Sequence, residues 1–257
     1  MIHPRISAFL GGEERSGQLV VFDKDGTLID FDYMWGGWIE ELARRLERAA
    51  GVALADRLFR AVRYDPATRK VDPAGPLAIS SMADLRRLAV EVLREAGVPA
   101  EHSEQADAIA WYIPDPVALA RPLADLPKLF GALRERGLRI AIATTDDRAP
   151  TEATVRALGV ARLVDALACG DDGHALKPAP DAVLSLCARL GAAPERAAVV
   201  GDTAADLRMG RAAGAALNVG VLSGVGSSDV LGPLADVLLP SVAELIGGRD
   251  RPEKLSG

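Results

Sequence analysis

The chain has 257 residues, of which 49% are hydrophobic and only 4% aromatic, enough for one large domain or a domain with a smaller insert. Its formal net charge of -6 disfavours nucleic acid as a partner, and no polybasic run provides attraction to a membrane surface. No apolar stretch approaches the roughly 18 residues of a membrane span. Cys169 and Cys187 lack metal-ligand spacing and are interpreted as reduced, which predicts a cytoplasmic protein.

The first 115 residues divide into three segments of different character. Residues 1–17 lack an apolar signal core, and we predict a loose N-terminal leader there, with packing on the core as the open alternative. Residues 18–32 contain the apolar run LVVF (19–22), a predicted buried strand, followed by DKDGT (23–27). Residues 33–115 have helical periodicity without a clear strand, which predicts a separate small helical domain inserted after the first strand.

Residues 116–250 return to an alternating pattern of strands and helices. Apolar runs that predict strands are LRIAIAT (138–144), RLVDALAC (162–169), RAAVVGD (196–202), AALNVGV (215–221) and ADVLLP (235–240). Amphipathic helical segments lie between them, as in βαβ units. The predicted fold class is therefore α/β, a Rossmann-like parallel-sheet core formed by 18–32 and 116–250 with the small helical domain inserted.

Polar residues follow the predicted strands directly, and in an open parallel sheet these positions meet at one edge. Asp23 and Asp25 follow the first strand, Thr144 and Thr145 follow the second, and Asp202 follows AAVVG, with Asp206 four residues later. Clustered carboxylates repel one another unless a cation is present, and Mg²⁺ suits a site with few carboxylates. The pattern therefore predicts a Mg²⁺ site at this edge.

Lys177 and the threonine hydroxyls add phosphoryl-binding groups to the same edge. An aspartate can attack phosphorus and form an aspartyl-phosphate. We expect Asp23 to be this nucleophile, with Asp25 protonating the leaving alcohol and then activating water.

Four short motifs resemble those of the haloacid dehalogenase superfamily, in the same order. They are DKDGT (23–27), IAIATT (140–145), Lys177 in KPAPD, and VVGDTAAD (199–206). The helical insert after the first motif resembles the cap of the subfamily that includes phosphoglycolate phosphatase and β-phosphoglucomutase. The resemblance implies a phosphoric monoester hydrolase with a Rossmann-like core and a helical cap over residues 33–115.

The resemblance also implies a role for each matching residue. Asp23 is the expected nucleophile and a metal ligand, Asp25 the general acid and base with its main-chain carbonyl on the metal, and Asp202 the remaining ligand. Thr144 and Lys177 would bind the phosphoryl group. The supporting residues are Gly26, Thr27, Thr145 and Asp206.

Several alternatives remain open at this level. A phosphomutase of the β-phosphoglucomutase type uses the same carboxylates, and a receiver-like module accepts one phosphoryl group without turnover. Asp25 and the helical insert disfavour the receiver-like module, and the hydrolase is favoured over the mutase because no mutase-specific groups can be identified in residues 33–115. The expected substrate is a small phosphorylated metabolite, with phosphoglycolate as one candidate. The protein is expected to act as a monomer or homodimer.

The predicted cap contains candidate residues for binding the leaving group. These are Arg63, Tyr64, Arg69 and Lys70, for which solvent exposure is the competing interpretation. Trp35 and Trp38 are expected to pack under the cap, with a place at the mouth of the site as the alternative.

Overall fold

The structure is a computed structural model that describes residues 2–11, 18–80 and 82–247. The chain forms two compact units. The core unit comprises Met1–Asp30 and Pro116–Gly257, and the helical unit comprises Phe31–Asp115. Within the described residues, no helix is both long and apolar enough to cross a membrane.

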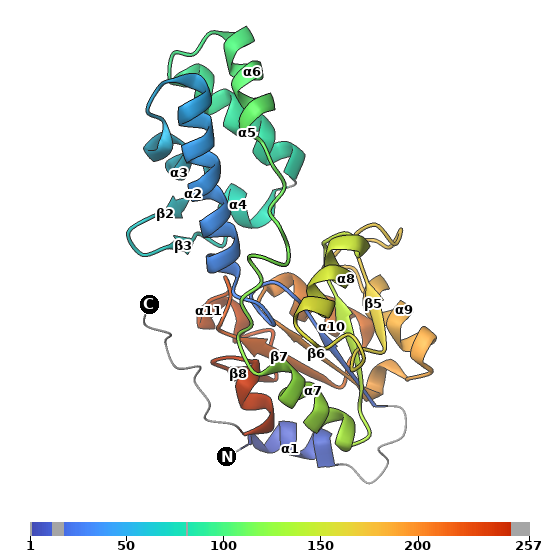
Figure 1. Cartoon of the computed structure of the whole chain (residues 1–257). Coiled ribbons are helices and arrows are strands. Elements are labelled where there is room, and N and C mark those ends of the chain that lie inside the picture. The colour runs from blue at the N-terminus through green and yellow to red at the C-terminus, as the bar shows by residue number, and fades with distance from the viewer. Residues whose placement is uncertain (1, 12–17, 81, 248–257) are drawn as a thin grey trace. The chain divides into compact units, whose positions relative to one another are not determined.

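The core unit contains a six-stranded parallel sheet in the order β5-β4-β1-β6-β7-β8 (Figure 1). Its strands are β1 (Leu19–Phe22), β4 (Arg139–Ala143), β5 (Ala166–Ala168), β6 (Ala197–Gly201), β7 (Leu217–Val221) and β8 (Val237–Leu239). Phe22 at the end of β1 is in register with Ile142 on one side and Val200 on the other. The residues that follow β1, β4 and β6 therefore leave the sheet at the same edge, and the predicted α/β fold class is confirmed.

Helices cover both faces of this sheet. They are α1 (Pro4–Gly11), α7 (Leu126–Glu135), α8 (Arg148–Ala157), α9 (Asp181–Leu190), α10 (Ala204–Ala213) and α11 (Ser228–Leu231), with the 3₁₀ helices η1 (Pro194–Arg196) and η2 (Val242–Ile246). Val20 and Phe22 of β1 belong to one apolar cluster with α7, whereas Leu19 and Val21 belong to another with α9 and α10. Alternate residues of β1 thus face opposite clusters. Because both faces of the strand are buried, its sequence is an unbroken apolar run.

The N-terminal segment differs from the prediction of a loose leader. Pro4–Gly11 forms α1, whose Ile6 and Leu10 are buried in the same apolar cluster as Phe22. These two side chains are four residues apart and so share one helix face. The sequence left open whether this segment packs on the core, because a two-turn stripe is too short to stand out there, and residues 1 and 12–17 lie outside the described part.

The helical unit contains α2 (Phe31–Ala50), α3 (Ala55–Val62), α4 (Pro76–Ile79), α5 (Met82–Glu95) and α6 (Ala100–Ala110). Contrary to expectation it also contains strands, a hairpin of β2 (Tyr64–Asp65) and β3 (Lys70–Val71). The Asp65 carboxylate accepts hydrogen bonds from Ala67 N at 2.9 Å and Thr68 Oγ1 at 2.6 Å. Local turn hydrogen bonds define this hairpin, and its two-residue strands leave no periodic apolar signal.

Aromatic side chains pack inside the helical unit. Trp38 is fully buried, and its ring lies 5.7 Å from that of Trp35 and 5.5 Å from that of Trp111 in edge-on contacts. The Trp38 indole Nε1 donates to Tyr112 O at 3.1 Å. The α2 tryptophans therefore form part of an internal aromatic cluster.

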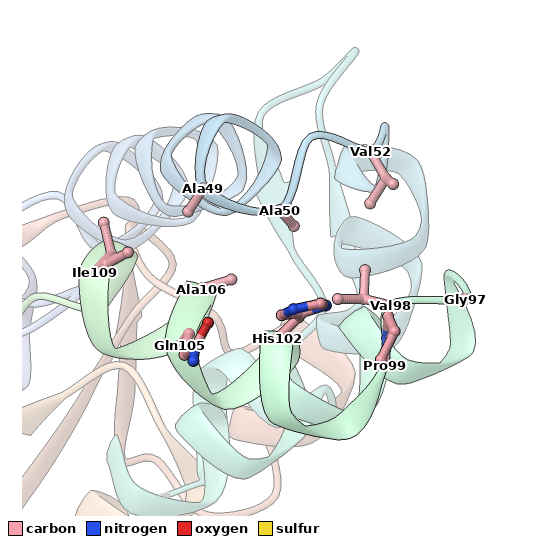
Figure 2. A pocket seen from close by; sticks show the side chains of 10 residues that line it. All are labelled: Ala49, Ala50, Val52, Gly97, Val98, Pro99, His102, Gln105, Ala106 and Ile109. Atoms are coloured by element: carbon pink, nitrogen blue, oxygen red, sulfur yellow. The ribbon is translucent and has the colours of Figure 1, made fainter.

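A recess of about 250 Å³ also lies in the helical unit (Figure 2). It is bounded by the end of α2, the turn at Gly97–Pro99 and α6, which contributes His102 and Gln105. None of the predicted catalytic carboxylates lines it.

The two segments at the ends of the insertion are bonded to each other within the core unit. Asp30 N donates to Arg121 O at 2.8 Å, and Leu123 N donates to Leu28 O at 2.9 Å. Ile29 and Pro122 form an antiparallel bridge between these two bonds. The chain thus departs for the helical unit and returns from it along one paired connection.

Candidate active site

Asp23 is positioned by the continuation of the β1 ladder. Its main-chain N–H donates to Val200 O at 2.8 Å, so the residue is fixed one step beyond the end of the strand. Lys177, from the loop before α9, places its Nζ 2.5 Å from Asp23 Oδ1 and 2.7 Å from Asp206 Oδ1. The Lys177 side chain is only 7% exposed, so these contacts are made largely out of water. An ammonium group therefore bridges the expected nucleophile and the acidic residue of α10.

Asp23, Asp202 and Asp206 form the acidic cluster, with one carboxylate oxygen from each lying within 4.8 Å of the others. Asp202 follows β6 directly and is fully buried. Its carboxylate accepts hydrogen bonds from Thr27 Oγ1 at 3.1 Å and Val225 N at 2.9 Å. These donors fix the orientation of Asp202 but leave the cluster with more negative than positive charge.

Burial and mutual repulsion raise the pKa of two carboxyl groups in this cluster, those of Asp23 and Asp202. Burial raises the pKa of Asp23 to about 7; Lys177 opposes the shift, and the charges of Asp206 and Asp25 add to it. Burial also raises the pKa of Asp202 well above its usual range, helped by the charges of Asp23 and Asp206. A divalent cation bound by oxygen ligands relieves this repulsion, so the donor set fits Mg²⁺.

Asp206 is engaged on both carboxylate oxygens. Oδ1 accepts from Lys177, and Oδ2 accepts from Thr203 N at 3.0 Å and Thr203 Oγ1 at 2.5 Å. Asp206 N in turn donates to Thr203 Oγ1 at 3.2 Å, which completes a capping box at the start of α10. This arrangement is compatible with the expectation that Asp206 supports the site from outside the metal ligand set.

Gly26 provides the turn that follows the two aspartates. Its φ of 85° lies in the left-handed region, and a Cβ there would lie 2.4 Å from Asp202 Oδ2. Backbone conformation and close approach thus both require glycine at this position. The turn brings the buried Thr27 to its hydrogen bond with Asp202.

The loop after β7 is a part of the site that sequence reasoning missed. Ser223 Oγ donates to Gly26 O at 2.8 Å, while Val225 N is the donor to Asp202 already described. A Cβ at Gly224 would lie 2.0 Å from Asp202 Oδ2. The available signal was the glycine-containing run SGVG (223–226), which begins two residues after the end of the predicted strand at 215–221.

Gly224→Ala is expected to lower the affinity for Mg²⁺ by about 10- to 100-fold, because the added methyl group must displace the Asp202 carboxylate or the loop that holds it. Isothermal titration with Mg²⁺ measures this change. Gly131→Ala is the matched control, since Gly131 lies in α7 and a Cβ there meets no atom within 4 Å. Equal affinity in the two variants would show that the loop does not shape the site.

The remaining predicted residues lie around the loop after β4. Thr144 is buried, and its Oγ1 accepts from Asp146 N at 3.1 Å, whereas Thr145 is exposed. The Asp25 carboxylate is bound by Lys24 Nζ at 2.7 Å, and burial raises the pKa of Asp25 while Lys24 opposes the shift. The expected contribution of Asp25 to the metal is its main-chain carbonyl, so this side-chain contact does not compete with it.

These features are typical of a class of protein, the α/β enzymes that bind a phosphoryl group: a carboxylate beside a buried ammonium group, and a cluster of carboxylate oxygens that could hold a cation, at the carboxyl edge of a parallel sheet. Such a site neutralises and positions a phosphoryl group.

Comparison with known proteins identifies the family. The sequence pattern of the haloacid dehalogenase-like hydrolases matches residues 18–214, so the chain belongs to this family. Its place among the phosphoric monoester hydrolases, expected from the motifs, is confirmed. The match includes all four motifs and the helical unit.

Individual relatives carry phosphatase names. The chain is 29% identical over 238 residues to N-acetylmuramic acid 6-phosphate phosphatase of Pseudomonas aeruginosa, covering 90% of this chain and 94% of the relative. It is 26% identical over 197 residues to phosphoglycolate phosphatase of Aquifex aeolicus, covering 77% and 81%. A Thermotoga maritima structure provisionally named β-phosphoglucomutase superposes with a TM-score of 0.65 at 17% identity, covering 89% of this chain and 96% of the other, and shows the shared fold.

Proposed function

We propose that the protein is a Mg²⁺-dependent phosphatase that hydrolyses a small phosphate monoester through an aspartyl-phosphate on Asp23. The observation that carries the proposal is the buried Asp23 carboxylate, 2.5 Å from Lys177 Nζ and within the acidic cluster. Asp23, Asp202 and the main-chain carbonyl of Asp25 would hold the metal. When bound, Mg²⁺ supplies positive charge that favours ionised Asp23 and offsets the charge of the phosphoryl group.

The first half-reaction transfers the phosphoryl group to the protein. A bond forms between an Asp23 oxygen and phosphorus while the bond from phosphorus to the ester oxygen breaks, and that oxygen takes the proton of the Asp25 carboxyl group. Lys177 and Thr144 orient the phosphoryl oxygens. Water then attacks phosphorus, Asp25 accepts its proton, and the Asp23 carboxylate is regenerated as phosphate leaves.

We propose a small phosphorylated metabolite that also bears an acid group as the substrate. Support comes from the names of the two relatives, since N-acetylmuramic acid 6-phosphate and phosphoglycolate are both phosphate esters of acids. The residues of the helical unit that were suggested to bind the leaving group form ion pairs or hydrogen bonds within that unit. Lys70 lies 2.5 Å from Asp32, and Arg69 lies 3.3 Å from Glu40, which also accepts from Tyr64. We further propose a cytoplasmic location, supported by the buried Cys169 and Cys187, which form no disulfide. A monomer or homodimer is proposed as the oligomeric state.

Phosphate release from a panel of monoesters tests the proposal. The panel holds phosphoglycolate, N-acetylmuramic acid 6-phosphate, neutral sugar phosphates, nucleotides and 4-nitrophenyl phosphate, each assayed with Mg²⁺ and with a chelator. We expect multiple turnovers that need the metal, with the highest kcat/KM on the acid-bearing esters. Interconversion of sugar-phosphate isomers without phosphate release would identify a mutase, and one phosphoryl group per chain would identify a phospho-acceptor module.

A further inference from the structure

Lys24 stands between the two catalytic aspartates and has no role in the mechanism described so far. Its side chain is 2% exposed, although lysine is rarely buried without partners. The ammonium group lies 2.7 Å from both carboxylate oxygens of Asp25 and 2.9 Å from Asp146 Oδ2. Lysine offers three donors, and these three contacts account for all of them.

Asp146 is itself fixed by the loop after β4. Its N–H donates to Thr144 Oγ1 at 3.1 Å, and its main-chain carbonyl accepts from Gly170 N at 2.8 Å. Lys24 therefore connects the Asp25 carboxylate to the loop that carries the expected phosphoryl-binding threonine. The link joins the loops that follow β1 and β4, which are neighbouring strands.

Stability does not require a buried ion-pair network at this position, although Lys24 compensates the charges of Asp25 and Asp146 once they are there. Burying an ammonium group costs hydration, and replacing buried ion pairs by apolar side chains is often neutral for stability. An unpaired Asp25 carboxylate, 16% exposed, is free to rotate about its side-chain bonds unless a partner holds it. The contact of one ammonium group with both oxygens restricts that rotation.

We propose that Lys24 is a positioning residue, which holds the Asp25 carboxyl group in the orientation that delivers a proton to the leaving oxygen. This inference rests on the proposed phosphatase function. Misplacement of an acid by a fraction of an ångström slows a step that depends on proton transfer. Esters of weakly acidic alcohols need the proton most, because their alkoxide is a poor leaving group, whereas 4-nitrophenolate leaves without it.

The test is the dependence of kcat/KM on the leaving group in the full chain with Mg²⁺. For Lys24→Met we expect kcat/KM to fall by about 10- to 100-fold on alkyl phosphates and by less than about 3-fold on 4-nitrophenyl phosphate. Asp146→Asn, at a position 30% exposed, is expected to give the same pattern with a smaller loss. When Lys24→Met and Asp146→Asn are combined, the loss of kcat/KM should be smaller than the product of the two single losses, because both substitutions break the same network.

Lys128→Met is the matched control, since it removes an exposed lysine of α7 from the same unit. Equal losses on alkyl and nitrophenyl esters in both Lys24→Met and Asp146→Asn would assign these residues a structural role and overturn the inference. Unchanged kcat/KM in both variants would overturn it as well. Failure of the unsubstituted protein to turn over any ester contradicts the proposed function instead, so the two failures are distinguishable.

Discussion

Asp23→Asn is expected to abolish phosphate release, with a loss of roughly four orders of magnitude or more, because an amide cannot form the aspartyl-phosphate. The substitution preserves the shape of the side chain, and Lys177 keeps its contact with Asp206 at 2.7 Å. Steady-state assays on the best ester measure the loss. Acid quenching of the unsubstituted protein with a ³²P-labelled ester should in addition yield one acid-stable, hydroxylamine-sensitive phosphoryl group.

The expected loss must not arise from unfolding. Urea denaturation of Asp23→Asn should give a midpoint close to that of the unsubstituted protein, since the substitution also removes one negative charge from the acidic cluster. Appreciable turnover by a folded Asp23→Asn variant would show that another group attacks phosphorus. Labelled phosphate should then appear on a different residue.

Lys177→Met is expected to lower kcat by about 10³-fold and to lower the free energy of unfolding by on the order of 3 kcal/mol in the presence of a chelator. Catalysis suffers because a charged donor to the phosphoryl group is lost. Stability suffers because Asp23 and Asp206 lose the buried cation that lies 2.5 and 2.7 Å from them. Steady-state assays and urea denaturation measure the two effects.

Addition of Mg²⁺ distinguishes two explanations for the lower stability of Lys177→Met, the loss of charge compensation and the loss of packing. If Lys177 compensates the acidic cluster, saturating Mg²⁺ should restore more stability to Lys177→Met than to the unsubstituted protein, since the metal then supplies the missing positive charge. Lys128→Met should change neither kcat nor the unfolding midpoint. An equal effect of Mg²⁺ on Lys177→Met and on the unsubstituted protein would assign the loss of stability to packing alone.

Much of the core could be predicted because the sheet is buried on both faces. LVVF, IAIA and AAVVG are unbroken apolar runs, each followed at once by polar residues, and parallel pairing then brings those residues to one edge. Asp23 and Asp202 lie together as this rule requires, and Lys177 from the loop before α9 and Asp206 from the first turn of α10 join them. The proximity of the residues that follow the strands could therefore be predicted from the apolar runs and the parallel topology.

Other features depend on contacts between segments that carry no pattern of their own. The hydrogen bonds of Ser223 and Val225 to Gly26 and Asp202 link residues far apart in the chain, and the glycines of SGVG indicate a close backbone approach without indicating these partners. From the sequence alone, Lys24 resembles a solvent-exposed lysine in a turn. Its role becomes visible only in the structure, where Asp146 Oδ2 lies 2.9 Å from its ammonium group. The β2–β3 hairpin and α1 were missed because their apolar signal spans too few residues.

The paired connection at Leu28–Asp30 and 121–123 has a consequence for how this protein can change over evolution. The core unit itself holds the two ends of the insertion together through main-chain hydrogen bonds, which do not depend on side-chain identity. The entropy of closing an inserted loop grows only slowly with its length, by about 0.6 kcal/mol for each doubling. An inserted unit of another length or sequence can therefore be accommodated if its two ends lie side by side. The carboxylates of the core can then keep their geometry while the inserted unit is exchanged.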